Sequence, residues 1–171
     1  MAPFPIRQFG DPVLKQPCSE VTEIDGALRR LVDGMLETMY EAPGVGLAAN
    51  QVGVQKRLFV YDVGEGPNVV INPVLSSLSG EWIHHEGCLS VPDLWWDIPR
   101  AKEVRLTGLD LDGDEIQIDA DELLARVFQH ETDHLDGYLL LERITAKEKK
   151  EAMRTLRERA MGLSSDGAPA R

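Results

Sequence analysis

Cysteine and long apolar stretches are scarce in this sequence. Two cysteines, Cys18 and Cys88, occur among 171 residues, which is too few for a disulfide framework. No stretch approaches the roughly 20 apolar residues that a membrane-spanning helix requires, and residues 1–7 lack the apolar core of a secretory signal. We therefore expect a cytoplasmic protein with no membrane segment, whose cysteines are thiols that serve metal or catalytic chemistry or have no special role.

Positive charge is also in short supply. With 18 Lys and Arg against 29 Asp and Glu, the formal net charge is −11, which argues against a nucleic-acid-binding surface over most of the chain. Residues 147–159 are the exception, since they contain six basic and three acidic side chains. A solvated helix is the usual explanation of such a segment, and docking to an anionic partner is the alternative.

The chain is long enough for one domain with its own core. Apolar residues at helical spacing predict helices over 25–42 and 119–137, and the capping box Thr145-x-x-Glu148 begins a third. Short strands are predicted over 57–61, 68–71, 82–84, 103–111 and 115–118, the last two joined at Asp112-Gly113 as a hairpin. This order of elements predicts an α+β fold.

The segment from His130 to His134 has the pattern His-Glu-x-x-His. On a helix, residues four apart lie one above the other, so both imidazoles can reach one metal ion. Glu131 lies about 100° further round the helix, close enough to handle the protons of a water that the metal activates. Two solvated histidines on a polar helix face are the alternative.

The helical wheel favours the metal. At about 100° per residue, both histidines and Glu131 lie in one arc of about 160° that also holds the apolar Leu123 and Val127. Burying three such polar groups is costly unless something satisfies them, and a metal does so. The wheel assigns the outer side of the helix to Arg126, Gln129, Thr132, Asp133 and Asp136. The sequence therefore predicts an interior metal site in a metal-dependent hydrolase.

A third protein ligand is required, with the fourth position left to water. One zinc-peptidase pattern would place a histidine where this chain has Leu140. The remaining candidates are Cys88, His84, His85, Glu151 and Glu158. A thiolate is the strongest binder of a borderline metal in this set, but chemistry alone leaves the choice open.

Three segments together resemble one known family. Residues 44–53 (GVGLAANQVG), 86–92 (EGCLSVP) and 129–137 (QHETDHLDG) closely resemble the three motifs of bacterial peptide deformylases, in that family's order and approximate spacing. The resemblance implies small antiparallel sheets packed around a central metal-binding helix, with N-terminal and C-terminal helices. It also implies a single catalytic domain over 1–163, and we expect a disordered tail over 164–171.

The resemblance further implies the chemistry of the site. It makes Glu131 the general base and then the general acid, with the Gln51 side-chain amide and the Leu89 backbone N–H holding the oxyanion. The reaction it implies removes the N-formyl group from the initiator methionine of newly made polypeptides and releases formate. The metal would be ferrous iron, replaceable by zinc, nickel or cobalt, and its ligands would be Cys88, His130 and His134.

Substrate contacts are expected from two places. Leu123 and Val127 share the arc of the ligands, so they would line a pocket for the methionine side chain, although simple core packing also explains them. Val45-Gly46 would pair with a substrate backbone by strand addition, with a tight turn as the alternative. A surface role is the alternative for Gln51, and we expect His85 to lie on the surface.

Two further features are specific to this chain. Residues 93–97 contain Trp95 and Trp96 where many bacterial members have a basic residue, so preference beyond the first residue of the substrate stays open. In the family, the C-terminal helix is associated with ribosome docking, which the basic segment 147–159 would serve. The competing functions are a small metallopeptidase and a non-catalytic metal-binding module.

Overall fold

The computed structural model describes residues 3–162, so the tail expected over 164–171 lies outside the described residues. Within 3–162 the α-helices are α1 (Gly26–Glu41), α2 (Glu122–Leu135) and α3 (Ala146–Ala160), and the 3-10 helices are η1 (Pro12–Lys15), η2 (Ala49–Val52) and η3 (Leu140–Glu142). The strands are β1 (Gly46–Ala48), β2 (Leu58–Tyr61), β3 (Asn68–Ser79), β4 (Trp82–Cys88), β5 (Val91–Arg100), β6 (Glu103–Leu109) and β7 (Glu115–Asp121). None of the described helices has the length and apolar character needed to cross a membrane.

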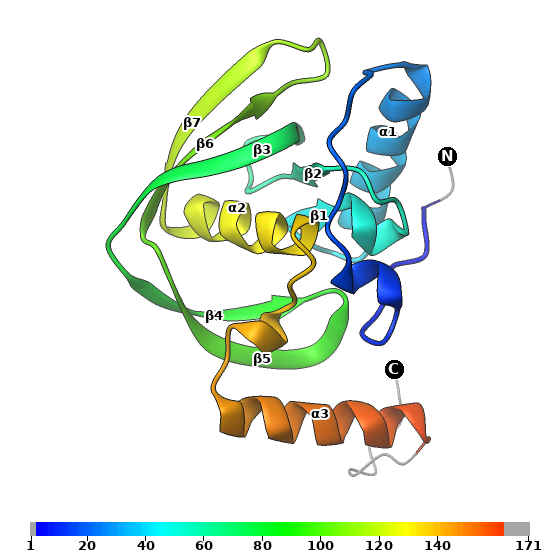
Figure 1. Cartoon of the computed structure of the whole chain (residues 1–171), viewed down its shortest axis with the longest axis vertical. Coiled ribbons are helices and arrows are strands. Elements are labelled where there is room, and N and C mark those ends of the chain that lie inside the picture. The colour runs from blue at the N-terminus through cyan, green and yellow to red at the C-terminus, as the bar shows by residue number, and fades with distance from the viewer. Residues whose placement is uncertain (1–2, 163–171) are drawn as a thin grey trace.

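The strands form two antiparallel sheets around α2 (Figure 1). The larger sheet has the order β1-β2-β3-β6-β7, and β4 pairs with β5 as a separate hairpin. Figure 1 shows α2 between the larger sheet and this hairpin, with α1 beside the β1–β2 end of the sheet. The expected α+β fold, with small antiparallel sheets around a central helix, is confirmed.

Two apolar clusters hold these layers together. One side of the sheet packs on α2, where the rings of Phe59, Tyr61 and Phe128 meet at centroid distances of 5.2–6.1 Å. In the second cluster, the apolar stripe of α1 packs on residues of β1, β2 and β3, among them Leu47 and Leu58. The 3.6-residue period of the α1 stripe is thus the direct cause of its packing.

Three of the five residues that the wheel assigns to the outer side of α2 are buried, contrary to that prediction, whereas Asp136 is exposed as predicted. Arg126, Gln129 and Thr132 are 3%, 8% and 8% exposed. These side chains are buried because the β4–β5 hairpin and the segment that leads from it into β6 cover this side of α2. Arg126 binds Glu86 of β4, and the Gln129 amide exchanges hydrogen bonds with the backbone of Ala101. A helical wheel describes one helix in isolation, so it cannot show that a polar segment from elsewhere in the chain will pack against the polar face of that helix.

Other boundaries also differ from the sequence prediction. The second helix begins at Glu122 rather than near Asp119, because β7 pairs with β6 up to Asp121. The strand predicted over 68–71 continues to Ser79, the one predicted over 82–84 continues to Cys88, and β5 was not predicted. These extensions depend on pairing with distant strands. The end of α2 is as predicted, since Gly137 has a φ of +85° after the last turn.

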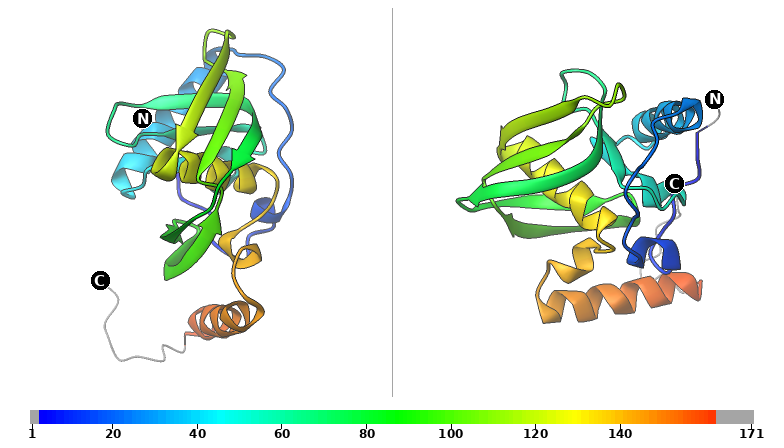
Figure 2. Two further views of the ribbon diagram at one scale, coloured as in Figure 1. Left: turned by 90° about the vertical axis from the view of Figure 1, so that its left-hand side faces the viewer. Right: turned by 45° about the horizontal axis from the view of Figure 1, so that its top comes forward.

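The C-terminal helix α3 lies at one end of the molecule, beyond the β4–β5 hairpin (Figures 1 and 2). It begins with the expected capping box, in which Thr145 Oγ1 accepts from the Glu148 N–H and the Glu148 carboxylate accepts from the Thr145 N–H. Ala152 is its buried residue. Near its end, Arg159 Nη1 donates to the Pro92 carbonyl oxygen of β5 over 2.7 Å. Most of α3 therefore faces solvent.

Candidate metal centre

The fold brings a cysteine from β4 to two histidines of α2. Cys88 Sγ lies 3.3 Å from His134 Nε2, which lies 3.1 Å from His130 Nε2. The ligand atoms of all three residues lie within 4.8 Å of one another. The other sequence candidates are not part of this cluster, and His85 lies on the surface as expected, where it faces Asp97.

These three donor atoms fit a divalent metal. Neighbouring ligands of a tetrahedral ion at about 2.0–2.3 Å lie roughly 3.3–3.7 Å apart, which is close to the separations found here. The two imidazole nitrogens and the sulfur converge on one space, and once the thiol has lost its proton, all three can direct a lone pair at a single ion there. Softness of the thiolate suits zinc, ferrous iron or cobalt better than magnesium or calcium.

Glu86 of β4 contacts His130 and fixes the orientation of its imidazole ring. His130 Nδ1 lies 2.8 Å from Glu86 Oε2, and because a carboxylate only accepts, Nδ1 carries the proton and Nε2 is left as the donor atom for a metal. Arg100 binds the same carboxylate through Nε and Nη2 at 2.9 and 2.7 Å. Burial alone would raise the pKa of Glu86, but the hydrogen bonds from His130 and Arg100 outweigh it and hold that pKa well below its usual range.

Glu131 is buried beside the cluster with one oxygen free. It is 4% exposed, and its Oε2 has no hydrogen-bond partner among residues 3–162. Burial raises the pKa of Glu131 to about 7, the range in which a carboxylate exchanges protons efficiently near neutral pH. Gly46 of β1 makes room for it, because a Cβ there would lie 2.6 Å from Glu131 Oε1.

Gln51 is a buried residue of η2, so the surface alternative is wrong for it. Its Oε1 accepts from the Ala48 N–H at 2.9 Å, which fixes the orientation of the amide. Its Nε2 then lies 3.1 Å from Ser90 Oγ and 3.8 Å from Cys88 Sγ. The side-chain N–H groups are therefore directed toward the end of β4 that carries the thiol.

Leu89 lies in the turn between Cys88 and β5. Its side chain packs against Gly44, where an added Cβ would lie 2.9 Å from Leu89 Cδ1. Val45 follows Gly44 and is 46% exposed. Gly46 belongs to a regular strand and lacks a positive φ, which weighs against the tight-turn alternative.

The two apolar residues of the α2 arc have different environments. Val127 is 4% exposed and belongs to the core cluster with Phe59, whereas Leu123 is 45% exposed. The expectation that both face the interior is therefore wrong for Leu123, which lies in the first turn of α2 where less of the fold covers the helix. Of the two tryptophans, Trp95 is 59% exposed with its ring over Gly87, and Trp96 is half-buried.

Several residues of this site were not assigned a role from the sequence. Glu86 and Ser90 lie within a motif segment in which only Cys88 and Leu89 were given roles. Asn50, whose Nδ2 donates to the His134 carbonyl oxygen over 2.6 Å, lies in another such segment. The buried Arg100 has no local signal, since its partners are 14 and 33 residues away.

Fold and site together define a class of protein: an α+β hydrolase domain in which a buried His-Glu-x-x-His helix meets a cysteine from a β-hairpin. The family model described as polypeptide deformylase matches residues 3–150. The chain belongs to the polypeptide deformylase family, which confirms the resemblance stated from the three motifs and the prediction of an enzyme.

Curated relatives and solved structures agree with this assignment. The peptide deformylase of Acidothermus cellulolyticus is 47% identical over 158 residues, which cover 92% of this chain and 88% of that relative. Peptide deformylase 1 of Corynebacterium glutamicum is 48% identical over 165 residues, or 94% of this chain and 98% of the relative. The crystal structure of peptide deformylase from Ehrlichia chaffeensis in complex with actinonin matches with a TM-score of 0.89 and 37% identity, over 93% of this chain and 98% of that one.

Proposed function

We propose that this chain removes the N-formyl group from the initiator methionine of newly made polypeptides and releases formate, using one divalent metal ion held by Cys88, His130 and His134. The observation that carries the proposal is the convergence of these three donor atoms beside a buried carboxylate, Glu131. Ferrous iron is the metal we expect, with zinc, nickel or cobalt as substitutes, because one thiolate and two imidazoles suit all four. We place the reaction in the cytoplasm, where new polypeptides are made.

A divalent metal at this position supplies a water molecule of lowered pKa and polarises a carbonyl oxygen. The residues of the chain account for the proton transfers. Glu131 takes a proton from the water as its oxygen bonds to the formyl carbon, and then gives it to the methionine nitrogen as the carbon–nitrogen bond breaks. The products are formate and a free amino terminus, so atoms and protons balance. The pKa of Glu131 near 7 suits both steps.

The negative charge that develops on the formyl oxygen needs donors already in place. The Gln51 Nε2 group is fixed by its neighbours beside Cys88, and the Leu89 backbone N–H follows Cys88 directly in the chain. We assign the oxyanion to these two groups, each of which is worth about 10²–10³ in rate at such sites.

Substrate binding is assigned to the edge of the larger sheet and the first turns of α2. β1 is the end strand of its sheet, so its second edge can take a peptide by strand addition at Val45 and Gly46. Leu123, with almost half of its surface accessible, would contact the methionine side chain. Val127 is packed in the core and would support that contact from beneath.

An assay that pairs formyl-Met-Ala with Met-Ala tests the function. We expect formate and Met-Ala from the first peptide and no cleavage of the second. Release of free alanine would show a metallopeptidase instead, and no reaction with either peptide while metal stays bound would leave a non-catalytic metal-binding module. Metal analysis of anaerobically purified protein identifies the ion.

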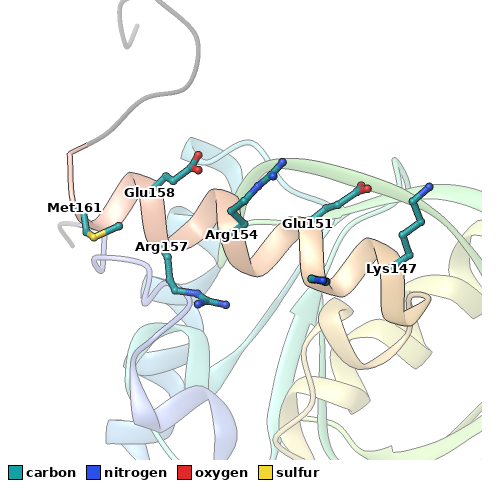
Figure 3. A pocket seen from close by; sticks show the side chains of 7 residues that line it. Lys147, Glu151, Arg154, Arg157, Glu158 and Met161 are labelled. Carbon is teal, nitrogen blue, oxygen red and sulfur yellow. The ribbon is translucent and has the colours of Figure 1, made fainter.

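We also propose that the exposed face of α3 docks on ribosomes and so brings the enzyme to nascent chains. Figure 3 shows the side chains along a shallow pocket on this helix, which is lined by Lys147, Lys150, Glu151, Arg154, Arg157, Glu158 and Met161. Four of these seven residues are basic, on a chain of net charge −11. RNA phosphates are the anionic partner that such a patch attracts.

Charge reversal tests the docking without removing the helix. The variant Lys150→Glu/Arg154→Glu should co-sediment with ribosomes less than the wild type at low salt, while its turnover of formyl-Met-Ala stays the same. The matched control is Arg30→Glu/Lys56→Glu, which reverses two exposed charges elsewhere. Equal loss in both variants, or no loss in the first, would refute docking through α3.

A further inference from the structure

Arg126 is a buried arginine one helical turn before His130, and it does not touch the three donor atoms. It is 3% exposed. Its Nη1 donates to Glu86 Oε1 at 2.7 Å, and its Nη2 donates to the Trp82 carbonyl oxygen. The guanidinium carbon lies 5.1 Å from the centroid of the Trp82 ring. Arg126 therefore binds β4 at two places, four residues apart.

The Glu86 carboxylate has a full set of donors. Oε2 faces His130 Nδ1 and accepts from Arg100 Nη2, while Oε1 accepts from Arg100 Nε and Arg126 Nη1. A carboxylate offers about four lone-pair sites, so these four contacts use all of them. Loss of Arg126 would leave one of these sites without a donor and would loosen the carboxylate that orients the His130 imidazole.

The four contacts differ in which elements they join. Arg100 and Glu86 both belong to the β4–β5 hairpin, so their ion pair lies within it. Arg126 belongs to α2, so its ion pair with Glu86 connects the hairpin directly to the helix. Two more contacts join the hairpin to α2: the His130–Glu86 contact itself, and the Arg100–Asp133 pair at 3.0 Å, on the other side of His130 along α2.

The position of Cys88 depends on the same contact between β4 and α2. Cys88 follows Glu86 by two residues at the end of β4, and both side chains contact α2, Glu86 at His130 and Cys88 at His134. The position of β4 against α2 therefore sets both the orientation of His130 and the distance from the thiol to the imidazoles. Arg126 influences both through one carboxylate and one carbonyl oxygen.

We propose that Arg126 is a positioning residue for the metal centre: by anchoring Glu86 and Trp82 of β4 to α2, it holds His130 Nε2 and Cys88 Sγ in ligating geometry. The inference rests on the proposed metal site but not on deformylation itself. Residues that orient metal ligands in this way typically contribute 10- to 100-fold to metal affinity. Since the Arg100–Asp133 tie remains when Arg126 is lost, we expect the lower end of this range.

The test is Arg126→Met in the full chain, which keeps an unbranched side chain against Trp82 and removes the charge and the donors. Cobalt(II) is the probe, with affinity measured by competition against a chelator and the site geometry by visible absorption. We expect about tenfold weaker cobalt binding and an altered ligand-field spectrum. The matched control is Arg105→Met, because Arg105 makes a similar two-point contact with Asp119 far from the donor atoms; it should bind cobalt as the wild type does.

Melting of the metal-free proteins separates positioning from general loss of structure. A purely structural role would lower the melting temperature of Arg126→Met and leave the cobalt spectrum of the folded fraction unchanged. If Arg126→Met does not fold, Arg126→Lys replaces it, since one ammonium group cannot span Glu86 and the Trp82 carbonyl together, and a smaller loss of affinity is expected.

Three results would overturn the proposal. They are wild-type affinity and spectrum in the folded Arg126 variant, an equal loss in Arg105→Met, and no cobalt binding by the wild type. The formyl-Met-Ala assay is read separately. Weaker cobalt binding in a protein that does not deformylate the peptide would leave the positioning role intact and refute only the proposed reaction.

Discussion

At the residue scale, Glu131 and Gly46 form the tightest fit of the site. The carboxylate occupies the space that any side chain at position 46 would need, because a Cβ would lie 2.6 Å from Oε1. Gly46→Ala should therefore displace Glu131 and lower kcat/KM for formyl-Met-Ala by about 10², the cost of a misplacement near 1 Å. The control is Gly26→Ala in α1, where the nearest atom is the mobile end of Arg30 at 3.3 Å. Unchanged turnover in Gly46→Ala would contradict the assigned position of the base.

Glu131 itself offers a second test at this scale. Glu131→Gln keeps the shape of the side chain and removes its ability to take a proton, so we expect turnover to fall by about 10²–10⁴. Metal content should stay at the wild-type level, since the carboxylate is not one of the three clustered donors. Metal analysis and the deformylation assay on the same preparation measure both. Retained activity would refute the proposed proton transfers.

Cys18 is the second thiol of the chain, and it lies in the core with 9% of its surface exposed. Burial, which outweighs the nearby Arg57, raises its pKa from 9.0 to about 11. A raised pKa in the folded state means that the full stability is present below pH 9 and declines as the pH rises from 9 to 11. We expect Cys18 to contribute about 1–2 kcal/mol to this decline.

The comparison is with Cys18→Ala, whose free energy of unfolding should fall less steeply over this interval. Only the slopes are compared, because the substitution also removes packing at neutral pH. Urea unfolding at several pH values gives both slopes. Parallel curves for the two proteins would contradict the assigned pKa.

At the element scale, α3 differs from α1 and α2 in how it is held. It has one buried residue, Ala152, so its stability depends on its capping box more than on tertiary packing. Thr145→Ala removes the side-chain acceptor for the Glu148 N–H and should cost about 1 kcal/mol. Amide exchange over residues 146–160, followed by mass spectrometry, should accelerate about fivefold, while Thr155→Ala serves as a control within the same helix. Exchange that stays at the wild-type rate would show that α3 is held by contacts other than its cap.

At the scale of the whole molecule, the proposed metal site joins elements that are far apart in the sequence. Cys88 from the hairpin and two histidines of α2 would share one ion, so removing it with a chelator should lower both activity and melting temperature. At 100 times the dissociation constant, a bound metal contributes about 2.7 kcal/mol to stability. Reloading with zinc should restore the melting temperature, and a melting temperature that does not respond to metal would contradict a site that bridges the two elements.

Oxygen sensitivity distinguishes iron from its substitutes. A thiolate that binds ferrous iron is open to oxidation, so the iron-loaded enzyme should lose activity in air, whereas the zinc-loaded enzyme should retain it. Aliquots of both forms, exposed to oxygen for increasing times and assayed with formyl-Met-Ala, measure the difference. Activity of the iron form that survives exposure would count against iron as the working metal.

Local sequence accounts for part of this protein and tertiary structure for the rest. Spacing alone predicts two histidines one turn apart and a glutamate beside them, because helix geometry depends on neighbours in the chain. The stripe of α1, the turn at Asp112-Gly113 and the cap of α3 follow from equally local rules. The three motifs also indicate the family, and the family in turn implies that Cys88, Gln51 and Leu89 act together with the histidines of this helix.

Only the tertiary structure decides which groups share a space. The choice of the third donor was open from chemistry, with two histidines and two glutamates as alternatives to Cys88. The pairing of β4 with β5 and their packing on α2 place Cys88 Sγ 3.3 Å from His134 Nε2. The same packing buries Arg126 on a side of α2 that the wheel assigns to solvent. Burial, pKa and donor geometry depend on contacts between segments tens of residues apart, so no periodicity within one helix can reveal them.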